Sequence, residues 1–232
     1  MTAQGALVLD STFRRVAAGS LLIVAPLLQT AAVVVDPGTW GDDREAVSFG
    51  DDPVLAQVQS VLYHWSWLLT AFAAFGLLHL VRRRAVALGH IAGAMTVVGY
   101  GSMSALLLTD PVSWWFGERY PAEEAERLAG EVLDLPGVVF GFTIPWLYLG
   151  IVGLPLLTVA VWRAGQAHWW VPALVAAGVL GSMLVPYGPA TIPFWAMPAV
   201  ALGSVGVRIL RMGPADWAAF YPEAPGRTTP AS

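Results

Sequence analysis

The chain has 232 residues, of which 56% are hydrophobic and only 12% are charged, and its formal net charge is −4. Because soluble domains carry roughly a quarter charged residues, this composition excludes an ordinary water-soluble globular protein. The absence of cysteine excludes disulfides and thiolate metal sites, and the absence of lysine excludes a Schiff base to a cofactor. All 12 basic residues are arginines, a bias that favours a bacterial membrane protein, and they form no basic face for nucleic acid.

Six apolar segments follow one another along the chain. Each is close to the about 20 residues that a helix needs to cross a hydrocarbon core of about 30 Å. None contains an acidic residue, and Arg208 is their only charge. The sequence therefore predicts an all-α, polytopic integral membrane helical bundle over residues 16–210, with about six transmembrane helices. The predicted spans are 16–35, 54–81, 86–108, 138–162, 169–185 and 192–210.

The distribution of charge predicts the orientation of the chain. Nine of the 12 arginines border one side of the predicted bundle, whereas two long connections, 36–53 and 109–137, hold 13 of the 16 acidic residues. By the positive-inside rule, the arginine-rich side is cytoplasmic and the acidic loops face outward. We therefore expect a multi-pass plasma-membrane protein whose N-terminal segment, 1–15, and C-terminal tail, 211–232, are both cytoplasmic.

The outer loops carry two further patterns. Residues 121–134 predict a surface helix, with glutamates near its positive end and an apolar stripe against the bundle. The run Asp36–Trp40 after the first span matches Asp110–Trp114 after the third at the Asp, Pro and Trp positions. One interpretation is a two-helix hairpin present three times. The other is ordinary helix termination by Asp-Pro with an interfacial tryptophan.

Four histidines are the side chains in or beside the spans that titrate near neutrality. Three of them, His79, His90 and His168, lie toward the predicted cytoplasmic side. Imidazole pairs ligate haem, so these three are candidate ligands of a haem b. The fourth, His64, has no outer histidine partner. The alternative to ligand binding is that the histidines form hydrogen bonds with lipid headgroups or with the backbone. We expect no resident metal or cofactor, with haem b as the alternative.

A candidate ligand pocket lies in the outer half of the predicted bundle, where aromatic side chains from three spans share one depth. Prolines beside them free backbone carbonyls and bend helices, which can open a cavity. Two aspartates could rim such a cavity with negative charge. The alternative is a packed bundle in which these are only kinks and interfacial residues. The pocket candidates are His64, Trp67, Trp146, Trp195, Asp36 and Asp110.

These features predict a class of function rather than one activity. No carboxylate or basic group lies at mid-bilayer, which disfavours proton-coupled transport and voltage sensing. We expect a non-catalytic protein that binds or passes a small lipophilic or cationic molecule, or supports a membrane complex; protein partners are not indicated. One alternative is a b-type haem or quinone redox protein. Another is a membrane enzyme acting on lipid-like substrates, with His64 as acid or base and Asp110 as its partner.

Overall fold

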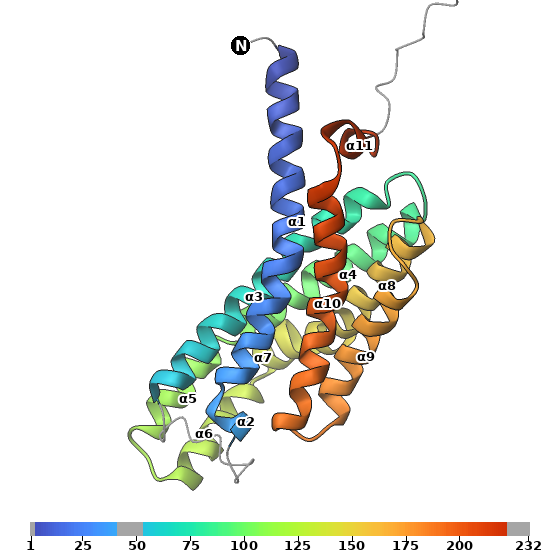
Figure 1. Ribbon diagram of the computed structural model, residues 1–232. Coiled ribbons are helices and arrows are strands. Elements are labelled where there is room, and N and C mark those ends of the chain that lie inside the picture. Colours follow the sequence, from blue (N-terminus) through green and yellow to red (C-terminus); the bar gives the residue numbers. More distant parts are fainter. Residues whose placement is uncertain (1–2, 41–52, 222–232) are drawn as a thin grey trace, which may run out of the picture.

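The computed structural model describes residues 3–40 and 53–221, which form an all-α helical membrane bundle with no strand in these ranges (Figure 1). Most of the first predicted acidic loop, residues 41–52, and the end of the predicted tail, residues 222–232, lie outside the described residues. All six predicted spans are helical. Their main helices are α1 (Ala3–Val35), α3 (Pro53–Leu80), α4 (Val86–Leu106), α8 (Ile151–Arg163), α9 (Trp170–Leu184) and α10 (Ile192–Arg211).

Five of the six segments are long and apolar enough to cross a membrane by length and composition, and the sixth, α9, has only 15 residues. Shorter helices connect or flank the spans. They are α2 (Pro37–Trp40), α5 (Thr109–Gly117), α6 (Ala122–Leu133), α7 (Pro136–Val138), the 3-10 helix η3 (Pro189–Thr191) and α11 (Pro214–Ala218).

The spans form a closed circle in chain order. Helix α1 packs against α3, α3 against α4, α4 against α8, α8 against α9, α9 against α10, and α10 returns to α1. The three helical hairpins are therefore pairs of neighbours in space, although whether they are true repeats stays a prediction. Figure 1 shows the start of α1 and α11 at one end of the bundle, with α2, α5 and α6 at the other.

The fourth span departs from the regular helix that the sequence predicts. Before α8 it contains two π-helical stretches, η1 (Val139–Thr143) and η2 (Trp146–Gly150), on either side of Pro145. Proline lacks a backbone N–H, so the ordinary hydrogen-bond ladder cannot continue through it. Segments of this kind are frequent at functional sites.

The ends of the bundle also differ in part from expectation. Helix α1 begins at Ala3, so most of the predicted N-terminal segment continues the first span. The surface helix expected at 121–134 is present as α6, and α5 is an additional helix in the same loop. In the predicted tail, α11 places Trp217 against His79, with ring centroids 4.0 Å apart.

Candidate functional site

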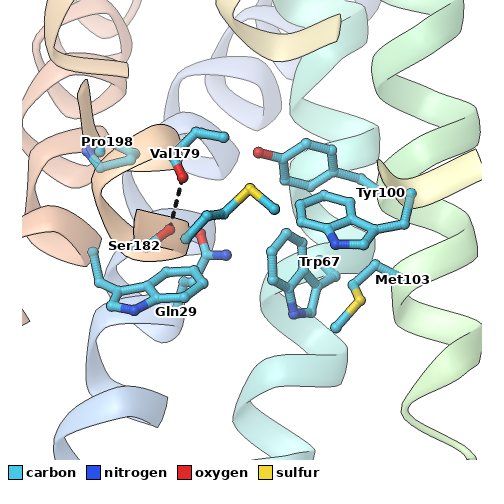
Figure 2. Close-up of a pocket in the computed structure, with 11 residues that line it drawn as sticks. Gln29, Trp67, Tyr100, Met103, Val179, Ser182 and Pro198 are labelled. Atoms are coloured by element: carbon cyan, nitrogen blue, oxygen red, sulfur yellow. Dashed lines mark hydrogen bonds between the residues drawn. The ribbon is translucent and has the colours of Figure 1, made fainter. Parts of the chain in front are cut away.

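A central, partly open cavity of about 160 Å³ lies between the helices, and every span contributes to its wall. Figure 2 shows its lining side chains converging from opposite sides of the bundle. The wall has one amide, one aliphatic hydroxyl and no charged side chain. Its residues are Gln29 from α1, Trp67 from α3, Tyr100 and Met103 from α4, Trp146 from η2, Gly178, Val179, Ser182 and Met183 from α9, and Trp195 and Pro198 from α10.

The structure brings together three of the six predicted pocket residues, Trp67, Trp146 and Trp195. With Tyr63 and Tyr100 they form an aromatic cluster. The centroid of the Trp67 ring lies 4.5 Å from that of Trp146, 5.1 Å from that of Tyr100 and 6.2 Å from that of Trp195. Two of these contacts are nearly perpendicular, at 74° and 86°, the edge-to-face geometry that aromatic quadrupoles favour. The rings therefore fix one another in place.

Close backbone contact positions Trp146 in this cluster. A Cβ atom on Gly99 of α4 would lie 2.1 Å from the backbone nitrogen of Gly150, so only glycine fits there. A Cβ atom on Gly150 would lie 2.2 Å from the Trp146 ring. Small residues let membrane helices approach in this way. The π-helical stretch and the two glycines together bring the Trp146 ring beside Tyr100, with centroids 5.4 Å apart.

The two predicted rim aspartates do not line the cavity but lie beyond one end of it. Asp36 is buried; it accepts hydrogen bonds from the Tyr187 hydroxyl and from the backbone N–H of Gly38 at 2.9 Å. Burial and the Asp36 charge raise the pKa of Tyr187, which keeps the hydroxyl protonated as a donor. Asp110 is half-buried near Asp36. Within the described ranges neither aspartate forms an ion pair.

His64 also lies beside the cavity without lining it. Its Nδ1 is 3.0 Å from the Ser104 hydroxyl oxygen, so it connects α3 to α4. Residues three apart on a helix differ by about 60° in direction, which turns His64 toward α4 while Trp67 faces the centre. Among the described residues no hydrogen bond joins His64 to Asp110, the pair expected in a lipid-modifying enzyme.

The three inner histidines have separate surroundings. His79 is buried, and its Nε2 lies 2.9 Å from the backbone oxygen of Trp217. His90 bonds to the backbone oxygen of Val86 at 2.8 Å, and His168 is exposed. In the part of the chain that the structure describes, no hydrogen bond or ring contact joins two of them, and no three His, Asp or Glu residues form a metal-binding group.

Sequence reasoning missed eight of the 11 wall residues, among them Gln29 and Tyr100. Both lie inside apolar spans, where an amide or a phenol hydroxyl is costly unless it faces the bundle interior. A polar side chain inside an apolar span is therefore expected to face the interior of the bundle, and this expectation could have identified both residues. Met103 and Met183 carry no comparable signal, because apolar residues occupy every face of these helices.

No known family matches this chain, and no curated protein or solved structure is significantly similar to it.

Proposed function

We propose that the chain is a plasma-membrane protein, of bacterial type and with both ends in the cytoplasm, that binds a small uncharged lipophilic molecule in the central cavity. The arginine asymmetry and the arginine-only composition support the location and orientation. The observation that carries the binding function is a cavity of about 160 Å³ whose wall is aromatic and aliphatic with few polar groups. Ligand sites in proteins have this composition.

The wall favours a neutral ligand over a cationic one. No aspartate or glutamate lines the cavity, and Asp36 already accepts three hydrogen bonds beyond its end. An ion moved into such a site loses its hydration without gaining a counter-charge. The size also limits the ligand, because an engineered apolar cavity of about 150 Å³ in another protein binds benzene. A single six-membered ring is therefore the expected scale.

Toluene tests the proposal as a probe. A ligand that binds only the folded protein stabilises it by about 2.7 kcal/mol at a concentration of 100 times Kd. For a chain of this length that corresponds to a rise in Tm of about 5–10 °C. We expect a saturable rise in the Tm of the detergent-purified protein with toluene and none with the benzylammonium cation.

Two adjacent residues of α9 provide a matched pair of variants. Val179 lines the cavity, whereas Leu180 is 52% exposed on the outer surface of the same helix. Val179→Phe should fill the cavity and abolish the toluene effect, and Leu180→Phe should leave it unchanged. Partition of toluene into detergent affects both variants equally. A Val179→Phe protein that responds like wild type, or a wild type without a saturable response, would refute the proposal.

A further inference from the structure

Two buried side chains in the cavity wall have polar groups without a protein partner. Tyr100 is 2% exposed and Gln29 is 5% exposed. Within the described residues the Tyr100 hydroxyl and the Gln29 amide make no hydrogen bond, and their polar atoms are not fully enclosed. Figure 2 shows both groups directed into the space between Trp67 and the Val179–Ser182 turn of α9. In an otherwise apolar wall, a ligand that bonds to these groups gains affinity, because a net hydrogen bond contributes about 0.5–1.5 kcal/mol.

Three other polar groups of the wall are already bonded or are enclosed by it. The indole N–H groups of Trp67 and Trp195 have no partner, but they have almost no accessible surface and so do not reach the cavity. The Ser182 hydroxyl already donates to the Val179 carbonyl at 2.9 Å. Tyr100 and Gln29 can each donate and accept. These two side chains therefore offer hydrogen bonds to a ligand, and a ligand with oxygen acceptors complements the Tyr100 hydroxyl and the Gln29 amide N–H.

The direction of the Tyr100 hydroxyl is set before any ligand binds. The Tyr100 ring packs at 85° against Trp146 and at 5.1 Å from Trp67, and Tyr100 lies next to Gly99, whose backbone contacts Gly150. A side chain held on several sides loses little conformational freedom on binding, which favours affinity. The hydroxyl is thus a fixed hydrogen-bonding group rather than a mobile one.

We propose that the ligand is a neutral six-membered ring bearing oxygen, of phenol or quinone type, whose oxygen atoms bond to Tyr100 and Gln29. This inference rests on the proposed binding function and specifies the chemical class of the ligand. The aromatic cluster contacts the ring of the ligand, and the two polar side chains distinguish an oxygen-bearing ring from a plain hydrocarbon.

Phenol and toluene distinguish binding in the cavity from recognition of an oxygen atom, because the two molecules have nearly the same shape and differ in that phenol bears a hydroxyl group where toluene bears a methyl group. We expect phenol to bind about tenfold more tightly than toluene, the effect of one net hydrogen bond. Tyr100→Phe and Gln29→Leu should each remove about that factor for phenol and leave the Kd of toluene unchanged. Tyr120→Phe, which alters a tyrosine that is 40% exposed and lies outside both the wall and the aromatic cluster, should change neither Kd. The toluene Kd also verifies that each variant folds with its cavity intact.

1,4-Benzoquinone distinguishes a quinone-type ligand from a phenol-type ligand. It can be used as a probe because this chain has no cysteine or lysine for the quinone to alkylate. Tighter binding of benzoquinone than of phenol assigns a ligand that only accepts hydrogen bonds, and the reverse assigns a phenol. If phenol and benzoquinone both bind no more tightly than toluene, or if the variants weaken toluene equally, the oxygen-bearing ligand is refuted and the cavity function stands. If none of the three binds, both proposals fail.

Discussion

The contact between Gly99 and Gly150 gives the sharpest test of the packing that forms the cavity wall. A methyl group added by Gly99→Ala would lie 2.1 Å from the Gly150 nitrogen and 2.2 Å from its Cα, where ordinary contacts begin at 3.4 Å. Both obstacles are backbone atoms, so α4 and the fourth span must separate by about 1 Å or more. Overpacking of this kind costs about 1–3 kcal/mol, and at 2–4 °C per kcal/mol the Tm should fall by about 2–12 °C.

Gly101→Ala is the matched control on the same helix. A Cβ atom there meets nothing within 4 Å, and alanine favours a helix over glycine by about 1 kcal/mol. Thermal unfolding of the detergent-purified proteins, followed by tryptophan fluorescence, should therefore place Gly101→Ala at or above wild type and Gly99→Ala well below it. Equal Tm values for the two variants would show that the helices do not meet at this glycine pair. Toluene binding should weaken only in Gly99→Ala, because Trp146 moves with its span.

Three further outcomes are expected. A cysteine at Glu126, on the exposed side of α6, should react with an impermeant maleimide from outside intact cells, and a cysteine at the exposed His168 only after permeabilisation. Tyr187→Phe removes a donor to buried Asp36 and should lower stability by about 1–3 kcal/mol at pH 8. Since the pKa of Tyr187 is raised above 10.0, that contribution is full below about pH 10 and declines as pH rises through the folded-state pKa. Trp217→Ala should cost about 3–5 kcal/mol, because this side chain is 2% exposed, and limited proteolysis should release the C-terminus.

Each of these experiments has an outcome that contradicts it. The reverse labelling pattern would invert the orientation. A stability difference between wild type and Tyr187→Phe that stays constant from pH 8 to strongly alkaline pH would exclude ionisation of this tyrosine as the cause. Trp162→Ala serves as the control for the tryptophan variant, since that side chain is 45% exposed and its loss should change the Tm little.

The sequence predicted the helical spans well because a transmembrane helix is recognised from its length and its apolar composition. It also predicted that Trp67, Trp146 and Trp195 share one depth, which follows from counting residues along each span. It could not predict which face of each span points inward. In a membrane the lipid-facing side is as apolar as the core, so helices such as α9 carry no amphipathic stripe that reveals rotation. For that reason His64 was placed in the pocket and Tyr100 was not.

The prediction that Asp36 and Asp110 rim the cavity shows a second limit of prediction from sequence. Asp36 and Asp110 do approach the same end of the bundle, as their positions after the first and third spans suggested. Whether an aspartate faces a cavity or is bonded to a side chain depends on contacts between distant segments. The donor to Asp36 is Tyr187, which is 151 residues away in the sequence. No local pattern indicates such a contact.

The π-helical stretch Trp146–Gly150 has a consequence for insertions and deletions in this protein. In an α-helix, loss of one residue rotates everything beyond it by about 100°, which would turn a whole span away from its neighbours. A π-type turn closes its hydrogen bond over one more residue than an α-turn, so it holds a surplus residue at one place. Deletion of one residue within 146–150 can therefore be absorbed locally, leaving the flanking helix in register with α4 and α9. Only the side chains of that turn, above all Trp146, would point in a different direction. A change in the length of the fourth span can therefore alter the shape of the cavity wall while the helices stay packed as before.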